Sequence, residues 1–301
     1  MRAIGILAVS VVLLLCSAAA AVASEPTLPR TERWYEIFLR GEKLGHSKVV
    51  WAPSTWEGRK TLHDTTTITE KSVRNMMGLR EEFETVMTID LERGDDGTLW
   101  WMRTVVEEAG RRSVDELTWT GKGYESVSRL DGQEQRIVVP MDEPVATDSE
   151  SFLGARIRAG EVRVGDRFEM RLLDLRARAA RVIPLVVVAQ EEVEDRSLAP
   201  ADAPEAGEGA SPPPIPTITC FKVEETDPQT GAKVLMWIDE DGAFVRLATD
   251  GGQTYRRVPR DQAETAPVRP AESRITTPAY PVLERIMAAD RLELDLHLQG
   301  D

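Results

Sequence analysis

Histidine and cysteine, the usual side chains of nucleophiles, bases and metal ligands, are scarce in this chain of 301 residues. The three histidines are His46, His63 and His297, and none stands at a metal-binding spacing from another histidine or cysteine. Cys220 lies in an alternating, strand-like run, whereas reactive cysteines gain a low pKa at helix N-termini or beside cations. We therefore expect no catalytic residue, no metal and no cofactor, and a buried, inert thiol at Cys220.

Carboxylates are the abundant reactive groups, with 51 Asp and Glu residues, several of them in adjacent pairs. A glycosidase requires two carboxyl groups that flank a sugar-binding cleft. With so many acids, a pair within reach arises by chance, so a carboxylate-based hydrolase is kept only as a minor alternative. His63 precedes Asp64, but neighbouring residues of a strand point to opposite faces of a sheet, which argues against a catalytic pair.

Methionine and tryptophan form the most distinctive apolar set. Both side chains suit irregular cavities and loosely specified ligands, although ordinary core packing is the alternative interpretation. Strand alternation places the adjacent Trp100 and Trp101 on opposite faces, so at least one is exposed or covered by another element. The candidate ligand-binding residues are Met76, Met77, Met87, Trp100, Trp101, Met102, Met170, Met236 and Trp237.

The elements that must position these side chains are short strands in which apolar and polar residues alternate. Turns that contain Gly and Asp separate them. Strands joined by such turns are antiparallel neighbours, so the first half is predicted to be a meander. One helix is predicted at 149–159, capped by Asp148 or Ser149 and ended by Gly160. The predicted strands are 34–40, 44–51, 61–72, 81–91, 99–107, 113–120, 124–130, 135–139, 168–175, 182–193, 217–225, 233–238, 243–249 and 254–258.

The first 23 residues have the pattern of a secretory signal peptide: Arg2, an apolar run, and small residues at Ala21 and Ala23. The apolar run is shorter than the roughly 20 residues that a spanning helix needs. We expect cleavage after Ala23, a periplasmic or secreted protein, and no membrane-spanning segment afterwards. Lipidation of Cys16 is an alternative that the preceding Leu15 disfavours.

The remaining chain divides into two regions. Residues 24–258 are predicted to form one antiparallel β module with a mobile Pro/Ala/Gly-rich insertion at 197–216, which is too poor in apolar residues to order itself. Residues 259–301 are predicted as a linker, a short helix at 282–289 and a terminal strand at 292–298. The formal net charge of −14 argues against nucleic acid as a partner, because phosphates would be repelled.

Two segments of the β module resemble a known bacterial family. Residues 34–39 (Trp-Tyr-Glu-Ile-Phe-Leu), followed by Gly41-Glu42-Lys43-Leu44-Gly45-His46-Ser47, resemble the opening of a module found ahead of transglutaminase-like domains in exported proteins. Residues 234–246, with Trp237-Ile238-Asp239 and Gly242, resemble a hairpin of that module that recurs in LolA-like half-barrels, which carry lipoproteins or bind apolar ligands. The resemblance covers roughly 33–258.

This resemblance implies a mainly β fold, a strongly curved antiparallel half-barrel with one or two helices. The family's catalytic Cys, His and Asp belong to a downstream domain that we expect to be absent here, so its activity is not carried over. We expect a non-catalytic cell-envelope module that binds a lipid, another apolar ligand or a partner protein segment. The alternative is an accessory domain that acts in trans with a transglutaminase-like or cysteine-peptidase partner, which would dock by strand addition near 292–298.

Overall fold

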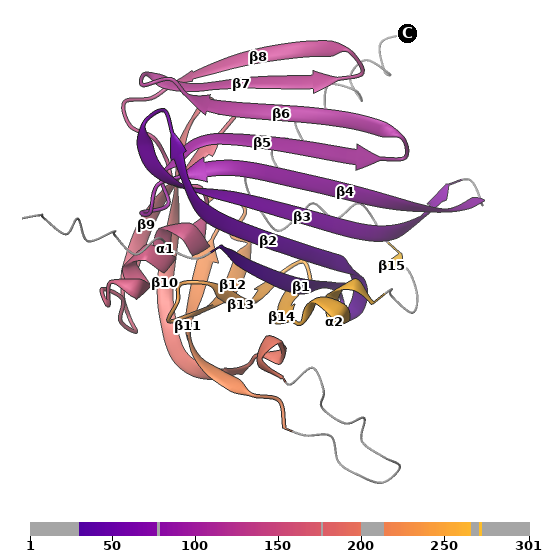
Figure 1. The fold of residues 1–301 in the computed structure, drawn as a ribbon, viewed down its shortest axis with the longest axis vertical. Coiled ribbons are helices and arrows are strands. Elements are labelled where there is room, and N and C mark those ends of the chain that lie inside the picture. Colours follow the sequence, from indigo (N-terminus) through magenta and orange to yellow (C-terminus); the bar gives the residue numbers. More distant parts are fainter. Residues whose placement is uncertain (1–29, 77–78, 176, 200–213, 266–270, 273–301) are drawn as a thin grey trace, which may run out of the picture.

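The computed structural model describes residues 30–76, 79–175, 177–199, 214–265 and 271–272 (Figure 1). Fourteen of the described strands form one antiparallel sheet in the order β8-β7-β6-β5-β4-β3-β2-β1-β14-β13-β12-β11-β10-β9. The mainly β prediction is therefore confirmed. The strands are β1 (Thr31–Leu39), β2 (Glu42–Trp56), β3 (Arg59–Met76), β4 (Leu79–Arg93), β5 (Leu99–Glu108), β6 (Arg111–Trp119), β7 (Gly123–Leu130), β8 (Gln133–Pro140), β9 (Arg167–Asp174), β10 (Ala179–Glu194), β11 (Thr217–Thr226), β12 (Lys233–Asp239), β13 (Phe244–Thr249) and β14 (Gln253–Val258).

Two meanders make up this sheet, β1–β8 and β9–β14, and one long-range pairing joins them. That pairing runs antiparallel from Trp34↔Val258 to Leu39↔Gln253. Tight turns account for the local order: Arg40 and Asp131 have positive φ and each precedes a positive-φ glycine. Two successive residues of this kind give the turn whose twist matches that of paired strands. Strands β10 and β11 pair up to Glu194↔Thr217, on either side of the undescribed residues 200–213.

The sheet curves until its two meanders approach each other, and residues 145–147 bridge the approach. The backbone N–H of Leu99 donates to the carbonyl of Val145 at 2.9 Å, and that of Ala146 donates to the carbonyl of Arg171 on β9, also at 2.9 Å. The hydroxyl of Tyr124 donates to the Leu99 carbonyl at 2.7 Å and accepts from the Val145 N–H at 3.1 Å. This segment thus ties β5 to β9 where no direct strand pairing exists among the described residues.

Helix α1 (Ser149–Arg158) follows directly and is the predicted helix, one residue shorter. Asp148 caps it by accepting from the Ser151 N–H at 2.7 Å. Gly154 of α1 packs against Gly242 in the turn between β12 and β13, where a Cβ on Gly154 would lie 2.5 Å from the Gly242 carbonyl oxygen. Only residues without a Cβ allow the helix this close to the sheet.

The region after residue 258, predicted to begin as a linker, contains two elements among its described residues. It contains helix α2 (Arg260–Glu264), whose Ala263 packs with Trp34 and Val258, and the short β15 (Ala271–Glu272), which pairs parallel to β3. Neither element carries the apolar periodicity that would have predicted it. The helix predicted at 282–289 and the strand predicted at 292–298 lie outside the described residues.

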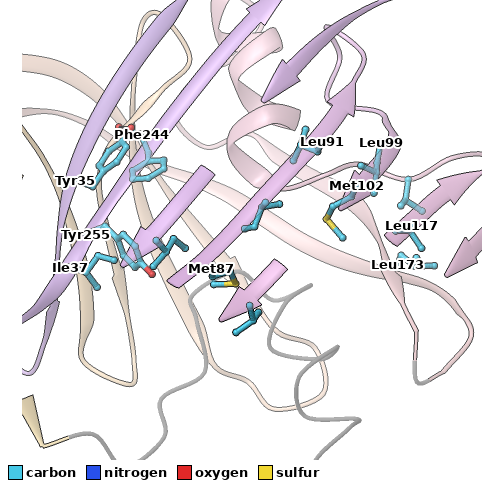
Figure 2. Close-up of a cluster of buried hydrophobic side chains, with 14 of the residues drawn as sticks. Tyr35, Ile37, Met87, Leu91, Leu99, Met102, Leu117, Leu173, Phe244 and Tyr255 are labelled. Atoms are coloured by element: carbon cyan, nitrogen blue, oxygen red, sulfur yellow. Dashed lines mark hydrogen bonds between the residues drawn. The ribbon is translucent and has the colours of Figure 1, made fainter. Parts of the chain in front are cut away.

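The core lines the concave face of the sheet in two clusters. In one of them Tyr35 stacks on Phe244 with ring centroids 4.2 Å apart, next to Ile37, Met87 and Tyr255 (Figure 2). The other joins Leu153 and Ile157 of α1 to the second meander, including Met170, Leu185 and Met236. Alternation accounts for both clusters, because every second residue of each strand faces inward.

Candidate ligand-binding cavity

A cavity of about 400 Å³ is lined by residues of the concave sheet face and of α1. Its walls are mostly apolar and come from both meanders. The volume lies within the range of about 300–1,000 Å³ that is typical of small-molecule sites. The apolar lining residues are Val49, Trp51, Leu62, Ile89, Leu91, Met102, Leu172, Val234, Met236, Phe244, Leu247 and Tyr255.

The first turn of α1 supplies a polar side of the cavity and is tied to the second meander. The Ser149 hydroxyl donates to the Glu225 carboxylate on β11 at 2.5 Å. The Glu150 carboxylate accepts from the backbone N–H of Phe244 at 3.1 Å. Each bond joins the start of the helix to a strand of the second meander, β11 or β13. Together they hold the helix over the cavity.

Burial changes the protonation of these two carboxyl groups. Burial and the neighbouring Asp148 carboxylate raise the pKa of Glu150 to about 8. Burial also raises the pKa of Glu225, against the lowering effect of the hydrogen bond from Ser149. A carboxyl group in a poorly hydrated site favours its neutral form. Glu150 therefore presents mostly a protonated carboxyl group at pH 7.

Asp64 and Arg93 form a buried ion pair in the cavity wall. The Arg93 Nε donates to Asp64 Oδ2 at 2.5 Å. The other carboxylate oxygen, Asp64 Oδ1, is buried and has no hydrogen-bond partner within the described part of the chain. Burial raises the pKa of Asp64, and the Arg93 charge opposes that shift. The ion pair thus satisfies only one of the two carboxylate oxygens of Asp64 among the described residues.

Three arginines also line the cavity: Arg33 of β1, Arg93 at the end of β4, and Arg158 in the last turn of α1. The Arg33 guanidinium lies over the Trp51 ring, 5.7 Å from its centroid. Arg158 Nη1 donates to the backbone carbonyl of Asp241 at 3.1 Å. The cavity therefore combines apolar walls with three arginines and five carboxyl groups, those of Asp64, Asp148, Glu150, Glu225 and Asp241.

The predicted methionines divide between cavity and core. Met102 and Met236 line the cavity. Met87 and Met170 are buried in the core clusters and do not line it. Met77 lies outside the described residues, as does the side chain of Met76.

The three predicted tryptophans do not line the cavity. Trp101 stacks on Trp56 with centroids 5.5 Å apart, while the Arg59 guanidinium lies 4.4 Å from the Trp100 ring centroid. Trp56 and Arg59 are a cross-strand pair and share one face of the sheet, so Trp100 and Trp101 lie on that same side. Their predicted placement on opposite faces is wrong, because a β-bulge at this point interrupts the alternation.

Trp237 is buried on the face opposite Met236. It packs with Cys220 and Val245, and the ammonium of Lys222 and the guanidinium of Arg246 lie over its ring. Burial raises the pKa of the Cys220 thiol to about 12. This thiol is far from the thiolate form that acts as a nucleophile.

Sequence reasoning missed the charged residues of the cavity. Asp64 follows Leu62 and precedes Thr66 and Ile68 in the alternation of β3, so all four face inward. A charged residue at an inward-facing position of a predicted strand was the signal that could have revealed this polar part of the cavity. His63, on the other face, lies with Nδ1 2.9 Å from Glu92 Oε1 and does not pair with Asp64. Among the described residues there is no group of three potential metal ligands, and no helix is long and apolar enough to cross a membrane.

Two solved structures are similar to this chain. One is a β-barrel-like protein from Brucella abortus with a domain of unknown function, DUF1849. It is 12% identical, with a TM-score of 0.43, over 77% of this chain and 97% of that one. The other is a DUF1089 family protein from Pseudomonas aeruginosa, 14% identical with a TM-score of 0.30, over 74% of this chain and 93% of that one. No protein-family model and no curated protein matches the chain. At these identities the likeness concerns the β-rich fold alone.

Proposed function

We propose that this chain is a non-catalytic, exported module of the cell envelope that holds an apolar ligand in its cavity. The observation that supports it most directly is the largely apolar cavity of about 400 Å³ between the curved sheet and α1. Apolar walls with a few convergent polar groups are typical of sites that bind small hydrophobic molecules. The leader at residues 1–23 supports export and a periplasmic or secreted location.

The carboxyl groups of the cavity support binding rather than hydrolysis. Asp64 is bound by Arg93, Glu225 by Ser149, and Glu150 by the Phe244 backbone. Hydrolysis by two carboxyl groups needs one ionised group and one acid that both face the substrate. Each of these three carboxyl groups already makes a hydrogen bond to the protein, which supports a structural role for it.

The test is to purify the exported protein from envelope extract and to record its native mass before and after delipidation. We expect a bound apolar molecule, or uptake of an added single-chain lipid by the delipidated protein. Val49→Phe fills part of the cavity and should lower that uptake. Val138→Phe places the same ring at a position that is 59% exposed and should leave uptake unchanged. Absence of any bound lipid, with no uptake across a panel of lipids, would refute the proposal.

A further inference from the structure

Glu150 places a carboxyl group at the cavity without a cationic partner. It lines the cavity together with Phe244, whose backbone N–H donates to Glu150 Oε1 at 3.1 Å. That bond is the only hydrogen bond of this carboxyl group in the described part of the chain, and the group forms no ion pair there. Because both bonded residues line the cavity, the carboxyl group lies where a bound ligand replaces water.

The surroundings of Glu150 favour its neutral form. Burial is the largest cause that raises its pKa to about 8, and the Asp148 carboxylate adds to the shift. The charges of Arg33 and Arg93 lower the pKa but do not outweigh burial. Arg93 is also occupied by its ion pair with Asp64. Glu150 therefore keeps its proton at pH 7 and loses it just above that pH.

The other titratable groups near Glu150 behave differently. Burial, together with the charge of Glu150, raises the pKa of the Tyr35 hydroxyl on β1, which therefore stays neutral through the same pH range. Burial also raises the pKa of Glu225, but the Ser149 hydroxyl donates to this carboxyl group and opposes the shift. The remaining charged side chains that line the cavity are Asp64, Arg158 and Asp241.

A ligand that fills the cavity changes the balance at Glu150, because apolar atoms take the place of water beside the carboxyl group. Loss of water penalises the ionised carboxyl group far more than the neutral one. The ligand thus strengthens the hold of Glu150 on its proton. Coupling of two binding events is reciprocal, so the proton strengthens the hold of the cavity on the ligand by the same factor.

We infer that the cavity takes up its apolar ligand together with a proton on Glu150, and that it releases this ligand as the medium becomes alkaline. This inference rests on the proposed function and adds the condition that controls binding. Asp148 and burial set the pH of release through their effect on Glu150.

The test is titration calorimetry of the delipidated protein with decan-1-ol, an apolar probe that has no titratable group between pH 6 and 9. The affinity should be about ten-fold lower at pH 9 than at pH 7, because about nine-tenths of Glu150 is ionised one pH unit above its pKa. At pH 8, titrations in phosphate and in Tris, whose ionisation enthalpies differ, should show uptake of about half a proton per bound ligand. Circular dichroism at each pH checks that the protein stays folded.

Two variants assign the effect to Glu150. Glu150→Gln keeps an acceptor for the Phe244 N–H and should bind decan-1-ol equally well at pH 7 and pH 9, without proton uptake. Asp148→Asn can still cap α1, but it removes a charge that raises the pKa of Glu150 and should move the loss of affinity to lower pH. Glu169→Gln, exposed on β9 and outside the cavity, is the matched control and should keep the wild-type pH profile.

The outcomes separate this inference from the proposed function. An affinity that is the same at pH 7 and pH 9, or a pH dependence that persists in Glu150→Gln, would overturn the coupling to a proton and leave the proposed function standing. If decan-1-ol binds at no pH, both fail.

Discussion

The Ser149 hydroxyl and the Glu225 carboxylate, 76 positions apart in the sequence, form a buried 2.5 Å hydrogen bond. Ser149 opens α1 and Glu225 lies on β11, so this contact joins the helix to the wall of the cavity. Because the helix is short, its position depends on such contacts with the sheet.

Replacing Ser149 with alanine removes the hydroxyl that donates to Glu225. We expect the free energy of unfolding to fall by about 1–3 kcal/mol, because a buried carboxyl group is left without its donor. Urea unfolding measures the change. The same Ser149→Ala substitution in a Glu225→Leu background should cost less, since no carboxyl group remains there. An equal loss in both backgrounds would show that the hydrogen bond carries none of the effect.

Gly154→Ala tests the close packing of α1 on the turn at Gly242. Alanine improves helix propensity by up to about 1 kcal/mol. The new Cβ, however, would lie 2.5 Å from the Gly242 carbonyl oxygen. We expect net destabilisation of about 1–3 kcal/mol in thermal unfolding, because overpacking outweighs propensity. Gly251→Ala, whose Cβ meets only the Thr249 hydroxyl at 3.5 Å, is the control and should be near neutral.

Glu150 makes stability depend on pH. Its folded pKa of about 8 lies above the usual value of 4.5, so the folded state binds the extra proton. The contribution of this proton to stability is full below about pH 4.5 and is lost as the pH rises towards 8. Glu150→Gln should remove that decline and make the protein more stable than the wild type above pH 8, by more than about 1 kcal/mol.

Urea unfolding between pH 4 and 9, with the exposed Glu169→Gln as control, measures this dependence. The glutamine can still accept from the Phe244 N–H, so the hydrogen bond itself is not under test. Parallel stability curves for Glu150→Gln and the wild type would contradict the assignment.

Tyr124→Phe tests the bridge at residues 145–147. It removes the hydroxyl that bonds both the Leu99 carbonyl and the Val145 N–H. We expect a loss of about 1–3 kcal/mol in the free energy of unfolding, together with faster amide hydrogen exchange at Val145. Tyr35→Phe removes one bond, to the Phe244 carbonyl at 3.1 Å. It should cost less and leave exchange at Val145 unchanged; faster exchange there in both variants would contradict a local role for Tyr124.

The strands and α1 were predictable because their signals are local. Alternation has a period of two residues, and glycine-containing turns set where each strand ends, so a window of about ten residues contains the information. The helix carried its own cap at Asp148. The short α2 and β15 lacked such signals, and contacts with β1 and β3 stabilise them.

The candidate site was only partly predictable for the same reason. Alternation states which residues of one strand share a face, as Val234 and Met236 of β12 do. It does not state which face becomes concave. The bulge at Trp100 also moved that residue out of the predicted alternation. Large adaptable side chains were therefore assigned to a ligand when several of them pack in the core or on the outer face.

By itself, the sequence determined the β-rich class, the order and antiparallel pairing of neighbouring strands, and the capped helix, all of which follow from contacts between residues close in the chain. Tertiary structure alone decided the pairing of β1 with β14, the bridge at 145–147, and the cavity that residues of both meanders line together. These features depend on how far the sheet curves. Curvature accumulates over many strands and brings together residues that no local pattern relates.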